Sequence, residues 1–350
     1  LIDQNFPAAL AYYSLESRYS QERWQEQSPA VSFEDVARPL KLLAQALTGE
    51  SLSLKPLPEL KEGMPNSFYF LPCTDGEAIY LPLVSKEFSS KALNVSAYRL
   101  AIAHQAGYLE FGTFNFKISS VAALFPTELF RACFQAIQDK VNSISPLEAF
   151  LRLFPKNNLA RDIFHMLEGS RVDHCLGREY RGLKKEMDLF LQKTLEKRPW
   201  PSSLPLQEAI LESILRITLL RKANDHFPSV VAFRLPELFS LLTPLWEKGA
   251  TVAESARVTV ILYRWLSTVP NFPSLTPSPE EELQDWSSLD RSLFTAQGMD
   301  YAPRLAPNEE PYHSLAPLPH RGQFRPELVQ KKLRLREVQK LLQQMEMGVP

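Results

Sequence analysis

The residues most able to do chemistry lie in two predicted helices, one around His104 and one around Glu168. The first contains the run AHQAGY, in which a histidine stands four residues before a tyrosine. Residues four apart share a helix face, and zinc hydrolases use this spacing in His-Glu-x-x-His for two metal ligands. Gln105 stands where the general base of such a site would be, and Tyr108 where the second ligand would be.

The side chains of Gln105 and Tyr108 argue against hydrolysis. Zinc hydrolysis needs three protein ligands, an open position and a carboxylate that takes a proton from the bound water. The amide of Gln105 is neutral and cannot be that base. Tyr108 is a poor metal ligand at neutral pH because a phenol has a pKa of about 10.

The second helix, predicted over residues 159–176, contains His165 and Glu168 three residues apart. Two interpretations follow. One is a residual metal site of His104 and Glu168, with His165 or His174 as a further ligand, which would hold a divalent metal weakly. The other is a buried hydrogen-bond network of His104, Tyr108 and Glu168 between the two helices. Buried polar groups need partners, which favours the network.

Two charged residues of the second helix, Arg171 and Asp173, are expected to form ion pairs. They are two apart and cannot face each other, so each needs another partner. We expect Arg171 to pair with Glu168, three residues earlier, and Asp173 to pair with Arg178 or Arg181. Such networks fix helix packing without requiring catalysis.

The composition narrows the class of protein. The chain has 350 residues, 45% hydrophobic and 23% charged, with a formal net charge of −1. This balance gives no general affinity for nucleic acid or membranes. There is no apolar run long enough to span a bilayer. Three widely spaced cysteines indicate a reducing compartment, and we expect the cytoplasm.

Helical periodicity dominates, so we expect a mainly α fold, in which a zincin-like helical core is one option. A β-hairpin is predicted at about 67–84, around the turn pair Asp75-Gly76. The next helix is predicted over 97–111, capped by Ser96 and ended by Gly112. Further helices are predicted at 8–23, 33–47, 127–141, 146–153, 184–196, 206–222, 235–246 and 252–268.

The chain divides into three predicted parts. Residues 1–269 form the helical N-terminal domain, residues 270–325 a Pro-rich arm or linker, and residues 326–350 a basic amphipathic helix. Aromatic residues of the arm, including Tyr312, suggest that parts of it pack on the body. His313 and His320 are expected to be exposed. The arm and the basic helix over 329–344 are candidate docking elements.

Three segments together resemble a family. TDGEAIYLP, YRLAIAHQAGYLEFGTFNF and IFHMLEGSRVDHCLGREYRGL, over about residues 65–190, are similar to the N-terminal region of the NorD/CbbO proteins. These are von Willebrand factor A-domain partners of MoxR-type AAA+ ATPases. The resemblance implies an adaptor that works with a hexameric ATPase to remodel a client enzyme, such as Rubisco or nitric oxide reductase, without catalysis of its own.

In this family the client-binding metal site lies in a C-terminal von Willebrand A domain with a D-x-S-x-S motif. The sequence contains no such motif, and we expect the chain to be the part that precedes that domain. We expect no cofactor for the present chain, with a divalent metal held weakly by His104 and Glu168 as the alternative. The alternative is a divergent zincin-like metalloprotein or metallohydrolase that uses His104 and Glu168.

Overall fold

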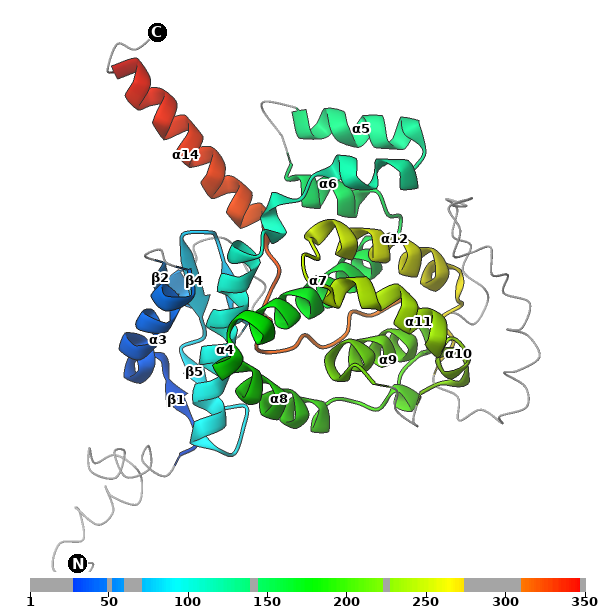
Figure 1. The fold of residues 1–350 in the computed structure, drawn as a ribbon, viewed down its shortest axis with the longest axis horizontal. Coiled ribbons are helices and arrows are strands. Elements are labelled where there is room, and N and C mark those ends of the chain that lie inside the picture. Colours follow the sequence, from blue (N-terminus) through cyan, green and yellow to red (C-terminus); the bar gives the residue numbers. More distant parts are fainter. Residues whose placement is uncertain are drawn as a thin grey trace, which may run out of the picture.

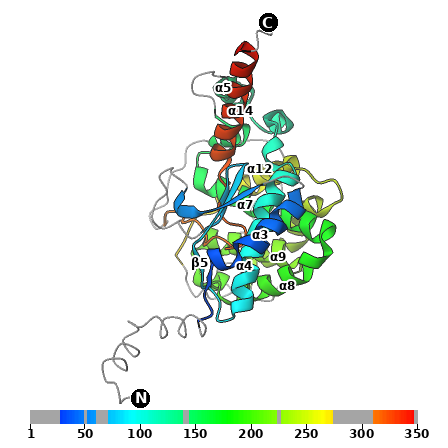
Figure 2. The ribbon, with the colours of Figure 1, turned by 90° about the vertical axis from the view of Figure 1, so that its left-hand side faces the viewer.

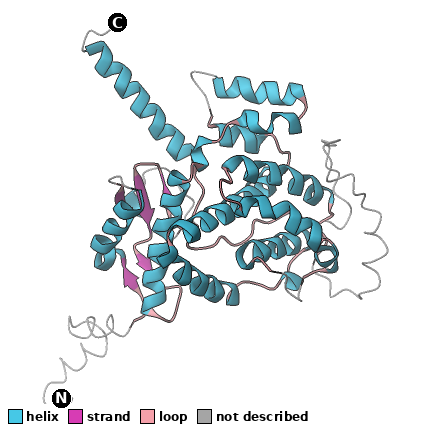
Figure 3. Cartoon of the chain, in the orientation of Figure 1, coloured by secondary structure: helices cyan, strands magenta, loops and turns pink. Residues whose placement is uncertain are grey.

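The computed structural model describes residues 28–48, 52–59, 71–138, 144–222, 227–273 and 310–346. The described part is mainly α, as predicted, and its short strands lie at one edge of the helical body (Figure 1, Figure 3). The predicted helix at 8–23 lies outside the described residues. None of the described helices combines the length and the apolar character that crossing a bilayer requires.

The strands form two small sheets. In the larger sheet β4 (Ala78–Leu81) lies between β2 (Ser53–Pro56), which is parallel to it, and β3 (Cys73–Thr74), which is antiparallel. β3 and β4 are the predicted hairpin, and Gly76 supplies the positive φ of its turn. The second sheet pairs β1 (Val31–Ser32) with β5 (Val84–Ser85).

Two buried helices form the centre of the body, α4 (Lys91–Glu110) and α7 (Asn157–Glu179). α7 packs against α4, α8, α9 and α12, so helices surround it on several sides (Figure 1). The other described helices of the body are α3 (Phe33–Thr48), α5 (Thr127–Gln138), α6 (Pro146–Arg152), α8 (Arg181–Glu196), α9 (Leu206–Leu220), α10 (Ser229–Phe233), α11 (Leu235–Leu242) and α12 (Val252–Thr268).

The start of α4 differs from the prediction. The helix begins at Lys91 after an N-cap at Ser90, and not after Ser96. The hydroxyl of Ser96 donates to Glu186 on α8 instead, at 2.6 Å. The predicted end is close, because Phe111 is the C-cap and Gly112 adopts the left-handed conformation that often follows a helix.

The last described part of the chain crosses the body before it leaves it. Residues 310–325, which we name the strap, run as irregular chain past α9 and α7 to the hairpin. Helix α14 (Pro326–Glu346) follows and rises from the body in both ribbon views (Figure 1, Figure 2). The strap is the longer of the two described parts of the predicted Pro-rich arm, and it packs on the body.

The close approach of α4 and α7 requires a glycine at position 107. A Cβ added to Gly107 would lie 2.8 Å from Cγ1 of Val172 and 3.5 Å from Leu176. We therefore predict that Gly107→Ala lowers the free energy of unfolding by about 1–3 kcal/mol through overpacking. Urea unfolding measures the change.

Gly177 on α7 is the matched control, because a Cβ there would lie 3.7 Å from its nearest neighbour, Lys184. Gly177→Ala should be neutral or stabilising, since alanine favours a helix. The double variant Gly107→Ala, Val172→Ala should recover part of the loss. Equal effects of Gly107→Ala and Gly177→Ala on the free energy of unfolding would contradict the packing argument.

Candidate functional site

The candidate site is centred on Asp173, a carboxylate of α7 that faces α4 and the strap. Its Oδ2 accepts from Nε and Nη2 of Arg321 at 3.0 and 2.8 Å. Nδ1 of His104 lies 3.3 Å from its Oδ1, and Nε2 of His320 lies 3.8 Å from its Oδ2. Burial alone would raise the pKa of Asp173, but Arg321 and His104 hold it well below the usual range.

The strap reaches Asp173 because two glycines leave room for it. A Cβ on Gly169 would lie 2.8 Å from both Cδ and Nη1 of Arg321. A Cβ on Gly322 would lie 2.1 Å from the carbonyl oxygen of Pro72, and the φ of Gly322 is +65°. Arg321 completes its contacts by donating from Nη1 to the carbonyl of Met166 at 3.1 Å.

Gln105 holds the backbone of the strap. Its Nε2 donates to the carbonyl oxygen of Arg321 at 2.7 Å, and both residues are buried. The next backbone bond, from the N–H of Gln323 to the carbonyl of Pro72, joins the strap to the hairpin at 2.7 Å. The position at which a zinc hydrolase carries its general base thus serves here as a hydrogen-bond donor to the chain itself.

A second buried pair, Glu168 and Arg171, lies on the same helix. The Arg171 guanidinium donates to both carboxylate oxygens, at 2.5 and 2.8 Å. Thr113 donates to Oε1 at 2.5 Å, and Ser255 of α12 donates to Oε2 at 2.7 Å. Arg171 also donates to the carbonyls of Phe111 and Ala250. Both oxygens of Glu168 are therefore engaged, by Arg171 on the same helix and by Thr113 and Ser255 from two other parts of the chain.

His104 and Tyr108 share a face of α4, as the spacing predicts, with ring centroids 4.7 Å apart. Burial lowers the pKa of His104 to about 4 against the opposing effect of Asp173, so the imidazole is neutral at pH 7. Burial also raises the pKa of the Tyr108 phenol above its usual range. A neutral phenol is a poor metal ligand, which agrees with the expectation from the sequence.

Two further histidines lie beside this face. The rings of His104 and His320 are 5.9 Å apart, and those of Tyr108 and His165 are 6.5 Å apart. Burial, with the charge of Arg321, lowers the pKa of His165 to about 3. Within the described chain, the Tyr108 hydroxyl, Nε2 of His104 and Nε2 of His165 have no hydrogen-bond partner. The result is a cluster of buried rings beside one charged pair, in which the imidazoles of His104 and His165 are neutral at pH 7.

A buried group of three charged residues fixes the middle of the strap. Arg198 and Arg216 both donate to the Glu212 carboxylate, at 2.6–3.1 Å. Arg198 also donates from Nη1 to the carbonyl of Ala316 at 2.7 Å. Near the start of the strap, the hydroxyl of Tyr312 donates to Asp162 at 2.6 Å. The strap is therefore bonded at intervals along most of its length.

Some of the sequence predictions for these residues are confirmed and others are wrong. The predicted Arg171–Glu168 pair forms. The predicted partners of Asp173 are wrong: Arg178 pairs with Glu179, while Asp173 faces Arg321 and His104. His313 is exposed as predicted. His320 is buried, with 2% of its surface exposed, because it follows Leu318 into the core.

The structure does not join His104 and Glu168 into one site. His104 faces Asp173, and Glu168 is occupied by Arg171, Thr113 and Ser255. Nor does the described chain contain any group of three His, Cys, Asp or Glu side chains arranged to hold a metal ion. A His104–Glu168 zinc site therefore does not fit these residues. The interpretation of His104, Tyr108 and Glu168 as one network is likewise wrong in detail, because the network has two separate centres.

Sequence reasoning did not find Arg321, the residue that most of the site contacts. Its signal is weak, since PHRGQF reads as one more loop in a Pro-rich stretch. Comparison with family models, with curated proteins and with solved structures yields no match to this chain.

The Asp173–Arg321 pair should dominate the stability of the strap. We predict that Arg321→Met, which keeps most of the side-chain volume, lowers the free energy of unfolding by about 3–5 kcal/mol because Asp173 is left buried and unpaired. Denaturant unfolding measures the loss. Adding Asp173→Asn removes the unpaired charge and should recover part of it.

The control is Arg178→Met, which removes an exposed guanidinium from the same helix and breaks only the surface pair with Glu179. It should change stability by less than about 1 kcal/mol. Additive effects of Arg321→Met and Asp173→Asn would contradict a direct pair, because contacting residues are coupled in a double-mutant cycle.

The buried neutral histidines predict that acid destabilises the protein. The folded-state pKa values of His104 and His174 are lowered to about 4 and that of His165 to about 3, mainly by burial. Between about pH 6.5 and 4 the unfolded chain binds more protons than the folded chain, so stability falls as the pH falls. His104 and His165, which are fully buried, each contribute a slope of up to about 1.4 kcal/mol per pH unit, whereas solvent screening reduces the contribution of the half-buried His174.

Urea unfolding of the native protein and of His104→Asn across this range tests the sign and the size. The free energy of unfolding of the variant should depend less steeply on pH, because unfolding of the variant takes up as much as one proton fewer. His313→Asn is the control, because His313 is exposed and its replacement should leave the slope unchanged. Equal slopes for the native protein and for His104→Asn would contradict a buried neutral imidazole.

Proposed function

We propose that this chain is the helical N-terminal region of a cytoplasmic adaptor that works with a MoxR-type AAA+ ATPase on a client enzyme. It acts by binding and not by catalysis. The starting point is the resemblance of the hairpin, the His104 helix and the Glu168 helix to the NorD/CbbO proteins. The client would be of the Rubisco or nitric oxide reductase type, engaged through a von Willebrand A domain.

The proposal that this chain does not catalyse a reaction is supported by the contacts of its central polar residues. Gln105 donates to the strap, Asp173 is paired with Arg321, and both oxygens of Glu168 are occupied. Groups engaged in this way hold four segments of the chain together. A general base has to be within reach of a substrate proton, and these side chains are bonded to their own chain.

The same contacts weigh against the metallohydrolase alternative. It requires His104 and Glu168 to share a metal, whereas Arg171 brings a positive charge to both oxygens of that carboxylate. A metal ion there would have to displace Arg171 and leave a buried guanidinium unpaired, which costs several kcal/mol. The binding function fits the geometry better.

The test is co-purification of the full-length chain with a MoxR-type ATPase of the same organism, in the presence of nucleotide. We predict a stable complex and a change in the rate of ATP hydrolysis when the chain is added. His104→Ala, if folded, should retain both effects, since the proposal gives His104 no catalytic part. If no complex forms in any nucleotide state, the adaptor proposal is overturned. Metal-dependent hydrolase activity that His104→Ala abolishes would support the metallohydrolase alternative in its place.

A further inference from the structure

One face of helix α14 is fixed to the hairpin. Leu328 and Val329 are buried against the hairpin, and Val329 lies beside the turn at Gly76. One turn further on, Lys332 pairs with Glu77 at 2.9 Å, and Arg336 pairs with the same carboxylate at 2.8 Å. These contacts set the direction in which the helix leaves the body and the face that it turns away from the hairpin.

That other face has the spacing of a coiled-coil seam. Positions 331, 335, 338, 342 and 345 alternate by four and three residues, and four of the five are apolar in the sequence. A left-handed pair of helices buries such a stripe against a partner. On the described part of the stripe, Leu335 is 48% exposed and Val338 is 52% exposed. The seam therefore has apolar side chains that the described chain leaves open to solvent.

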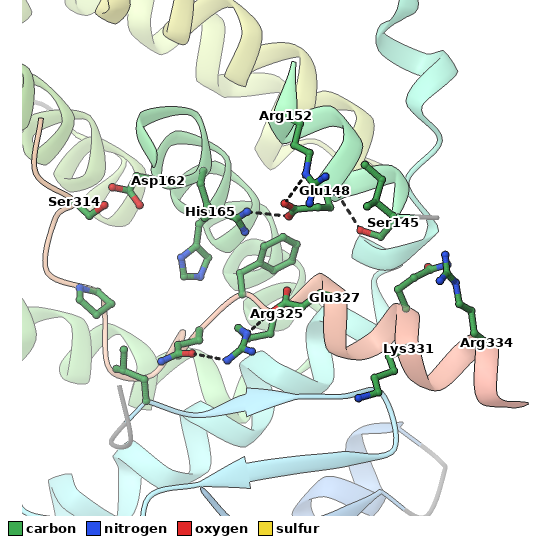
Figure 4. A pocket seen from close by; sticks show the side chains of 18 of the residues that line it. Ser145, Glu148, Arg152, Asp162, His165, Ser314, Arg325, Glu327, Lys331 and Arg334 are labelled. Carbon is green, nitrogen blue, oxygen red and sulfur yellow. Dashed lines mark hydrogen bonds and ion pairs between the residues drawn. The ribbon is translucent and has the colours of Figure 1, made fainter. Parts of the chain in front are cut away.

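The seam faces a groove of about 910 Å³ between α14, α6 and the end of the strap (Figure 4). One wall carries Lys331, Arg334, Leu335 and Val338. The opposite wall is formed by the start of α6, where the Ser145 hydroxyl caps the helix by accepting from the N–H of Glu148. The groove is thus bounded by one regular helix and by a capped helix end, both held by their own contacts.

The charge of the groove selects its occupant. Basic side chains outnumber acidic ones by five to three among the lining residues. Lys331 lies within the seam and Arg334 beside it. In a parallel, in-register pair of two copies of this chain, Lys331 would face its own copy, and like charges opposite each other are unfavourable. A helix with carboxylates at the facing positions would instead meet opposite charges.

We propose that this groove binds an amphipathic helix of a partner protein, with apolar residues at three- and four-residue spacing and with glutamate or aspartate beside them. The partner's apolar residues cover Leu335 and Val338, and its carboxylates meet Lys331 and Arg334. Binding of this kind is a helix-in-groove interaction, in which a few apolar anchors supply most of the affinity. The inference goes beyond the adaptor role, because it holds whichever protein supplies the helix.

Two synthetic helical peptides of 21 residues, the length of α14, test the proposal. Both carry leucine at the seam positions, and they differ only in having glutamate or lysine at the flanking positions. Fluorescence anisotropy with the full chain should give a dissociation constant on the order of micromolar for the glutamate peptide. The lysine peptide should bind at least about tenfold more weakly, and added salt should reduce the difference.

Substitutions on α14 locate the site. Leu335→Asp and Val338→Asp should each weaken binding of the glutamate peptide by about tenfold or more, because each removes an apolar anchor. Leu333→Asp is the matched control: Leu333 is 43% exposed on the same helix but does not line the groove, so this variant should bind as the native chain does. Thermal unfolding checks that the three variants are equally folded.

Three outcomes would overturn the proposal. They are no binding of the glutamate peptide, equal binding of both peptides, and an equal loss with Leu333→Asp. Sedimentation of the chain alone tests the remaining occupant. A dimer that Leu335→Asp and Val338→Asp dissociate, and Leu333→Asp does not, would assign the groove to a second copy of the chain in place of a partner helix.

Discussion

The buried pair of Asp173 and Arg321 is the interaction on which the rest of the structure depends. A carboxylate taken out of water is costly unless an opposite charge and hydrogen bonds compensate it. Arg321 supplies both at 2.8 and 3.0 Å, and it comes from a segment 148 residues away in the sequence. The pair obliges the strap to cross the body, and the crossing brings His320 and Phe324 against α4 and α7.

The glycines around this pair follow from it. Arg321 lies where a side chain at position 169 would be, and the turn at Gly322 lies against Pro72 and Gln105. Helix α7 accepts a glycine, which is unfavourable in a helix, because the guanidinium needs the space. Gln105 is then placed to bind the strap backbone. The polar residues on the facing sides of α4 and α7 are thus determined by a segment that is not helical and lies far along the chain.

The limits of sequence reasoning have the same origin. Helices α7 and α12 could be predicted because their apolar periodicity is local, and the hairpin because Asp75-Gly76 is a local turn signal. The Arg171–Glu168 pair is also local, three residues apart on one helix. The contacts of Asp173 are not local, and no spacing within α7 indicates them. The burial of His320 could not be predicted either, since a Pro-rich segment gives no periodic pattern that marks its inner side.

Phe324 connects the buried site to the proposed docking groove. Its ring stacks on Phe114 at 5.8 Å and lies 5.5 Å from Tyr108 and 6.0 Å from His165, while the same residue lines the groove beside α14. Phe324 lies three positions after Arg321 in the sequence. A helix bound in the groove would therefore contact the end of a strap whose other contacts lie in the core. A bound helix can shift the equilibrium between a docked and an undocked strap only as far as its own affinity for the two forms differs. The Asp173–Arg321 pair strongly favours the docked strap. The groove is therefore best suited to a partner that binds while the strap stays docked on the body.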